Sequence, residues 1–83
     1  MEMISTVPTL HRQAGYGFRF RMNDRSEPPH IHVEGHGGRA KYWLADESLV
    51  RAERYNRRQL AEIQRIVSVH ADEWLRRWHE YFD

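Results

Sequence analysis

The sequence predicts one α+β domain, in which a small, mostly antiparallel sheet of three to five strands packs against one long C-terminal helix. Two observations support this prediction. In the first half of the chain, apolar and polar residues alternate, as is typical of half-buried strands, and proline or glycine separates the alternating segments. In the last third, apolar residues recur at steps of three and four, as in an amphipathic helix. We expect a single domain over residues 1–83, with the sheet at about 4–52 and the helix at about 57–82.

Two segments alternate clearly enough to be predicted as strands. Within residues 15–23 the two faces receive Tyr16, Phe18, Phe20 and Met22 on one side and Gly17, Arg19, Arg21 and Asn23 on the other. Within residues 39–44 they receive Ala40, Tyr42 and Leu44 on one side and Arg39, Lys41 and Trp43 on the other. Weaker patterns at residues 4–10 and 49–52 are candidates for edge strands.

A further strand is predicted between these two segments. The Pro28-Pro29 pair lacks two backbone donors and favours an extended chain, so residues 30–34 are expected to begin a strand there. Because side chains alternate across the pleat, one face receives Ile31 and Val33, and the other receives His30, His32 and Glu34. The run GHGG at residues 35–38 predicts a tight hairpin turn that leads into the next strand.

The C-terminal helix is expected to begin after Asn56, a favourable N-cap residue. Its apolar stripe consists of Leu60, Ile63, Val67, Ala71, Trp74, Trp78 and Tyr81. A helix over residues 57–82 would be roughly 39 Å long, whereas a compact domain of this size is only about 30 Å across. It must therefore overhang the sheet, break, or bend, most readily near residues 68–70. An overhang would leave Trp78, Tyr81 and Phe82 available for contact with a second copy of the chain.

The face of the sheet that points away from the helix is predicted to be rich in cations. Phosphate contacts and base stacking on RNA are expected from Arg19, Arg21, Arg39, Lys41 and Trp43, together with Arg57 and Arg58 in the first helical turn. Arginines in a first turn are disfavoured by the helix dipole, so an anionic partner would explain them. The alternative is an ordinary solvated outer face, because charge patterning alone identifies no ligand.

The His30 and His32 pair is the sharpest local feature, because a spacing of two on a strand brings both imidazoles to one side. Histidine titrates near neutral pH, so the pair, continued by Glu34, is a candidate acid and base for RNA cleavage. The same spacing is used by metal ligands on strands, and His36 is the nearest third ligand for a divalent ion. His70 and His79 lie on or beside the apolar helix stripe, where we expect structural roles.

The composition restricts the classes of protein further. The chain has no cysteine, which excludes disulfides and thiolate metal sites, and its formal net charge is only +1. No apolar run approaches the roughly 20 residues of a membrane span, and the N-terminal residues do not form a signal peptide. We therefore expect a soluble, cytoplasmic protein without a membrane partner.

The segment Gly15–Leu44, GYGFRFRMNDRSEPPHIHVEGHGGRAKYWL, resembles a family of small bacterial proteins known as domain of unknown function 4160. The run P-P-H-I-H-V at Pro28–Val33 is its hallmark, and the W-x-x-Y-F ending of the helix also fits. Members are often encoded beside a second small protein in what look like toxin-antitoxin pairs, usually in the toxin role. The resemblance therefore implies a cognate small antitoxin-like partner and an RNA target. It carries over His30 and His32 as motif residues, without an established reaction.

Two hypotheses of different classes follow. The first is a toxin-like component of a bacterial type II toxin-antitoxin pair that binds or cleaves RNA, with His30, His32 and Glu34 as candidate catalytic residues. The second is a non-enzymatic module whose histidine row holds a divalent metal or a partner protein. A metal module should copurify with its ion and lose stability on chelation.

Overall fold

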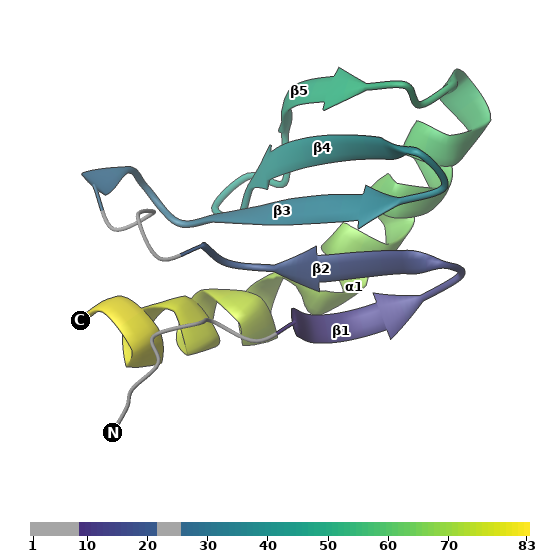
Figure 1. Cartoon of the computed structure of the whole chain (residues 1–83). Helices are drawn as coiled ribbons and strands as arrows, with labels where there is room; N and C mark the ends of the chain where they lie inside the picture. The colour runs from purple at the N-terminus through teal and green to yellow at the C-terminus, as the bar shows by residue number, and fades with distance from the viewer. Residues whose placement is uncertain (1–8, 22–25) are drawn as a thin grey trace.

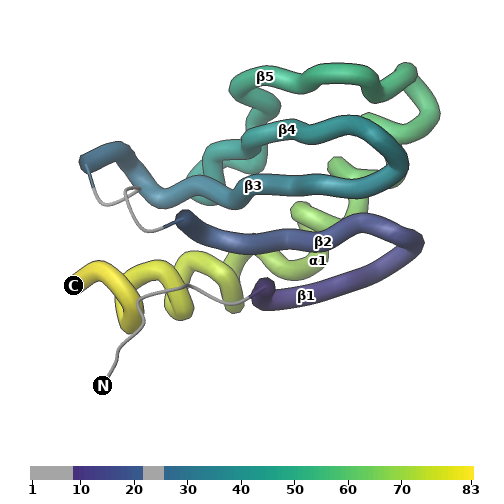
Figure 2. Tube along the Cα trace, viewed as in Figure 1, coloured from purple at the N-terminus to yellow at the C-terminus, as the bar shows by residue number. Residues whose placement is uncertain are grey.

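The computed structural model describes residues 9–21 and 26–83, and these form a five-stranded sheet followed by one helix. The elements are β1 (Thr9–Gln13), β2 (Tyr16–Arg19), β3 (His30–Gly35), β4 (Gly38–Trp43), β5 (Leu49–Glu53) and α1 (Arg57–Phe82). Neighbours in the sheet are also neighbours in the chain, and all four pairs are antiparallel. The chain meanders from β1 to β5, and α1 then returns across one face (Figures 1 and 2). The predicted α+β fold is confirmed.

Two of the hairpins have two-residue turns that suit the twist of antiparallel strands. The β3–β4 turn consists of His36 and Gly37, both with positive φ (53° and 81°), and the β1–β2 turn at Ala14 and Gly15 has the same feature. Positive φ at both central residues is the signature of a type I′ turn, in which glycine and polar residues are favoured. The turn predicted at residues 35–38 is thereby confirmed.

The strand boundaries refine the prediction at several places. The strand expected within residues 15–23 ends at Arg19, and Phe20 and Arg21 follow it, while the predictions for Met22 and Asn23 lie outside the described residues. The weak segment at residues 4–10 is described only from Thr9, where β1 begins. The weak segment at 49–52 is confirmed as β5.

The core lies between one face of the sheet and α1, as the alternation predicted. Ile31 pairs with Tyr42, and Val33 pairs with Ala40 on one side and Phe18 on the other, so these side chains share a face. All five are at most 5% exposed. The helix covers them with Ile63, Val67, Trp74 and other buried apolar residues. Burial of this apolar surface is the main driving force for folding such a domain.

The helix α1 begins and continues as its sequence predicts. Asn56 accepts a hydrogen bond from the backbone of Gln59, and the Gln59 side chain accepts one from the backbone of Asn56, which completes a capping box. The helix is continuous over 26 residues, so its length of roughly 39 Å is accommodated by an overhang. Its C-terminal turns extend past the strands at one end of the sheet (Figure 1). In the described part of the chain, no helix is both long and apolar enough to cross a membrane.

The overhanging turns find apolar contacts within the chain itself. The Phe20 ring lies 5.2 Å from Trp78, 5.8 Å from Tyr81 and 5.9 Å from Phe82, measured between ring centroids. Trp78 is buried, and only Tyr81 keeps substantial exposure, at 40%. Phe20, just beyond β2, therefore packs against this aromatic end within the chain. A homo-oligomer through Trp78, Tyr81 and Phe82 stays a prediction.

Candidate functional site

The strand register places the polar residues of the sheet on the face opposite the core. His30 pairs with Trp43, and His32 pairs with Lys41 on one side and Arg19 on the other. The His30 and His32 rings lie 4.9 Å apart. We call this face the outer face, and it carries Arg12, Arg19, His30, His32, Glu34, Arg39, Lys41, Trp43, Arg51 and Glu53. The predicted grouping of histidines with cations is thus observed in the register.

Part of the outer face is buried, contrary to the expectation of an outward-facing histidine row. His30, His32 and Lys41 are only 1%, 4% and 7% exposed. The His30 ring also lies 5.1 Å from the ring of Trp78, so His30 does not face away from α1 as predicted. The reason is the overhang of α1, which brings Trp78 beyond the end of the sheet to the first residue of β3.

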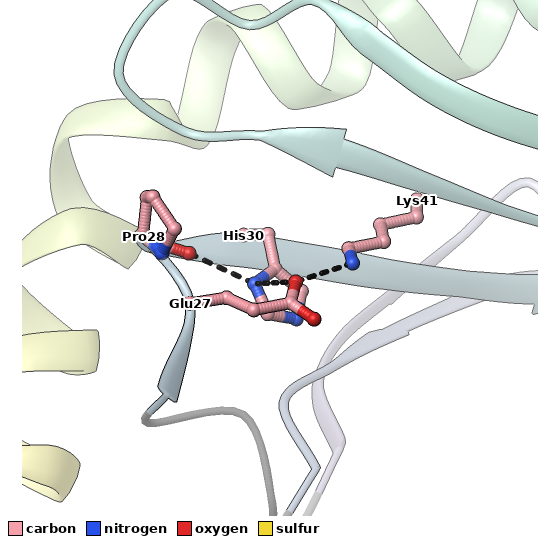
Figure 3. Close-up of polar contacts among 4 residues, drawn as sticks. All are labelled: Glu27, Pro28, His30 and Lys41. Atoms are coloured by element: carbon pink, nitrogen blue, oxygen red, sulfur yellow. Dashed lines mark hydrogen bonds and ion pairs between the residues drawn. The ribbon is translucent and has the colours of Figure 1, made fainter.

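A second set of contacts surrounds His30 from the segment before β3 (Figure 3). His30 Nδ1 lies 2.9 Å from the carbonyl oxygen of Pro28 and 3.8 Å from the Glu27 carboxylate. Because a carbonyl oxygen only accepts hydrogen bonds, Nδ1 is the protonated ring nitrogen and donates a hydrogen bond to the Pro28 carbonyl oxygen. Lys41 Nζ lies 2.5 Å from the same Glu27 carboxylate, across the corner that the two prolines make.

Glu27 is the site residue that sequence reasoning missed. A buried lysine is rarely found without a carboxylate beside it, so the burial of Lys41 is explained by this partner. The available signal was its position directly before the Pro28-Pro29 pair, which fixes the path of the chain into β3. The alternation pattern could not reveal it, because Glu27 lies outside any strand.

Carboxylates also accompany other cations that were predicted to bind phosphate. Arg39 Nε lies 3.2 Å from Glu53, and Arg19 Nε lies 3.9 Å from Glu34. Since both arginines are more than 40% exposed, each of these ion pairs contributes at most about 1 kcal/mol to stability. An incoming anion must nevertheless compete with a carboxylate at both positions.

Trp43 lies beside the buried His30 and Lys41, and its predicted stacking role stays a prediction. Its ring centroid is 5.2 Å from Lys41 Nζ and 5.9 Å from the His30 ring, and its side chain is half-buried. Glu34 is exposed on the same strand as the histidines, two residues beyond His32. A spacing of two corresponds to roughly 7 Å along a strand.

Two of the remaining predicted cations lie far from the histidine pair, at the start of α1. Arg57 and Arg58 are exposed in the first turn of α1, and Arg57 lies roughly 30 Å along the helix axis from Trp78, which contacts His30. Arg21 is half-buried just beyond β2. The sequence therefore predicted a larger common site than the fold assembles.

The metal hypothesis that included His36 is contradicted by the geometry. His36 lies in the turn at the far end of β3, where its Nε2 is 2.9 Å from the Ala14 carbonyl oxygen and its ring packs against Tyr16. Six residues of strand separate it from His30, which is roughly 20 Å. Within residues 9–21 and 26–83, no group of three or more histidine, aspartate or glutamate side chains is arranged to hold a metal ion.

The comparisons with known proteins identify the family. Residues 15–79 match the family model described as Domain of unknown function (DUF4160), which covers well over half of the chain. Neither the curated proteins nor the solved structures include a match. The matched range contains the Pro28–Val33 motif, the buried histidine pair and most of α1. The chain belongs to the DUF4160 family.

Proposed function

We propose that this domain is a non-enzymatic binding module, the partner-binding component of a two-protein toxin-antitoxin pair, in which His30 and His32 have structural roles. The observation that carries the proposal is their exposure of 1% and 4%. A general acid or base must come within hydrogen-bond reach of the proton that it transfers. Side chains this deeply buried are poorly placed to reach a ribose hydroxyl group.

The contacts of the histidine pair support a structural role. His30 connects three parts of the chain, since it contacts the Pro28 carbonyl, the Trp43 ring on β4 and the Trp78 ring on α1. Aromatic pairs at these distances add to stability beyond the area that they bury. In this proposal the prolines of the P-P-H-I-H-V motif set the bend before β3, and its first histidine, His30, packs between β3, β4 and α1. The residues of the motif are then explained without a catalytic role.

The surface that remains for a partner consists of exposed arginines and two sheet edges. In the described sheet, β1 and β5 each have a strand neighbour on only one side. Such edges present backbone donors and acceptors to which an extended segment of another protein can pair. The family resemblance supplies the expectation of a cognate protein, and the edges supply a means of binding it.

Coexpression with the product of the adjacent gene tests this proposal. We expect a complex of fixed stoichiometry in size-exclusion chromatography, and no cleavage of a mixed RNA pool between pH 6 and 8, with or without divalent ions. The folded variants His30→Gln and His32→Gln should inhibit growth as the wild type does, if the wild type inhibits growth. Cleavage by the wild type that is lost in the folded His32→Gln variant would overturn the proposal.

RNA binding is the second candidate function, and one observation favours it. A row of four basic residues crosses four adjacent strands of the outer face, and it consists of Arg19, His32, Lys41 and Arg51. Adjacent strands are spaced at about 4.8 Å. Such a row could follow a phosphate backbone, although Glu27 neutralises Lys41 at its centre. A titration with single-stranded RNA at two salt concentrations tests it, because phosphate contacts give a steep salt dependence.

A further inference from the structure

We infer that a hollow on the outer face, beside the edge strand β1, binds a carboxylate side chain from an acidic segment of the partner protein. The inference rests on the proposed binding function and adds the chemistry of the partner. The hollow has a volume of about 280 Å³, and its walls include Arg12, Arg19, Glu34 and three glycines, Gly15, Gly17 and Gly35.

The two arginines of the hollow keep hydrogen-bond donors that the described part of the chain does not use. Arg19 Nε is buried and has no hydrogen-bond acceptor among the described residues, since its nearest carboxylate oxygen, on Glu34, is 3.9 Å away. That distance is too long for a hydrogen bond. A buried N–H without an acceptor is unfavourable and is normally explained by a water, an ion or a ligand.

Arg12 approaches the hollow from the edge strand. It is exposed, and it forms no ion pair with any carboxylate in the described part of the chain. Arg12 pairs with Gly17 in the β1–β2 ladder, and a Cβ added to Gly17 would lie 3.6 Å from Arg12 Nη1. The missing side chain of Gly17 therefore leaves an open floor directly beside one guanidinium group.

The charge balance of the hollow selects an anion. Two guanidinium groups face one carboxylate, and the described residues add no other charged side chain to the lining. Guanidinium groups bind carboxylates with paired, charge-assisted hydrogen bonds. A carboxylate bound here would accept hydrogen bonds from Arg12 and from Arg19. It would also give Arg19 Nε the acceptor that Glu34, at 3.9 Å, does not provide.

The lining and the position favour a protein segment over RNA. Within residues 9–21 and 26–83, no aromatic side chain lines the hollow, whereas binding of single-stranded RNA relies on stacking of bases on aromatic rings. The hollow also adjoins β1, an edge of the described sheet. An extended segment that pairs with β1 alternates its side chains, so an acidic residue can point into the hollow.

Fluorescence polarisation with a labelled hexaglutamate peptide tests the inference directly. Hexaglutamine serves as the uncharged control, and a single-stranded oligoribonucleotide of equal charge as the competing class. We expect the double variant Arg12→Gln, Arg19→Gln to weaken hexaglutamate binding by about tenfold or more, because two charge-assisted contacts are lost. A matched control that also loses two charges, Arg65→Gln with Arg76→Gln on the exposed side of α1, should bind as the wild type does.

Gly17→Val supplies a test that keeps every charge. Gly17 has no positive φ, and the added Cβ meets neighbours only at ordinary contact distances, so the variant should fold. The valine side chain would occupy the space beside Arg12 in the hollow. It should therefore weaken hexaglutamate binding as strongly as removal of the two arginines does. Circular dichroism and thermal unfolding verify the fold of each variant.

Three results would overturn the inference: equal weakening in the matched control, unchanged binding by folded Gly17→Val, or tighter binding of the oligoribonucleotide through Arg12 and Arg19. Absence of hexaglutamate binding by the wild type at low salt also overturns it. In each case the proposed binding function stands if the adjacent gene product still forms its complex. That function fails separately, through RNA cleavage that depends on His32.

Discussion

The ammonium group of Lys41 lies 2.5 Å from the carboxylate of Glu27, and this ion pair joins β4 to the segment that precedes β3. The Lys41 side chain is 8% exposed, whereas that of Glu27 is 46% exposed. The lysine of the pair is therefore shielded from water, whereas the glutamate remains accessible to it. It closes over His30, whose Nδ1 is 3.8 Å from the same carboxylate.

Substitution of one partner of this pair should cost more than substitution of both. Glu27→Gln leaves a buried ammonium without its counterion, and we expect a loss of about 1–3 kcal/mol in the free energy of unfolding. Lys41→Met removes the charge and keeps much of the volume, so the double variant should recover part of the loss. Urea unfolding of both single variants and the double variant measures this coupling. Additivity within about 0.3 kcal/mol would mean that the pair is not coupled.

The contact between the helix overhang and Phe20 should be essential for stability. Phe20 is fully buried against Trp78 and Phe82, so Phe20→Ala should lower the free energy of unfolding by about 3–5 kcal/mol. Tyr81→Ala is the matched control, because Tyr81 contacts the same ring but is 40% exposed. A similar small loss for both variants in chemical denaturation would show that the overhang does not depend on Phe20.

Two glycines of the β3–β4 hairpin should differ sharply in their tolerance of alanine. A Cβ at Gly35 would lie 2.3 Å from the backbone oxygen of Gly15, whereas a Cβ at Gly37 would have no neighbour within 4 Å. Both residues have positive φ, so both variants are strained. We expect Gly37→Ala to lower stability by about 1 kcal/mol, and Gly35→Ala to lower the melting temperature much further. Equal melting temperatures would contradict the close approach of the two hairpins.

The stability of the domain should fall as the pH falls below about 6.5, and His70 should be one cause. Burial lowers the pKa of His70 below its ordinary value of 6.5, and the nearby His11 lowers it further. The unfolded chain therefore binds a proton on His70 at a higher pH than the folded chain does. The contribution of neutral His70 to the free energy of unfolding is therefore complete above pH 6.5. It is lost as the pH falls toward the pKa of His70 in the folded protein.

The variant His70→Gln should accordingly flatten the dependence of the melting temperature on pH between about 7.5 and 5. His79→Gln is the control, because His79 is exposed and interacts with Asp83 at the end of the helix. If His70→Gln and the wild type lose the same amount of stability over this range, His70 is not responsible for the pH dependence.

The local structure of this protein could be predicted from the sequence because it depends on local geometry. Side chains alternate along any strand, so the faces of Ile31 and His32 were assigned correctly from spacing alone, as the pairing with Tyr42 and Lys41 confirms. The helix start at Asn56 followed from its capping chemistry in the same way. These predictions required only neighbouring residues.

The character of the candidate site was decided by tertiary structure alone. Alternation assigns His30 to a face, but whether water reaches that face depends on segments distant in the chain. Trp78 reaches His30 because α1 is longer than the sheet is wide, and Glu27 reaches Lys41 because two prolines turn the chain there. Both contacts are made between residues separated in sequence, and no local period encodes them. The sequence by itself thus determined which residues share a face, and the packing of α1 and of the proline corner determined which of them are buried.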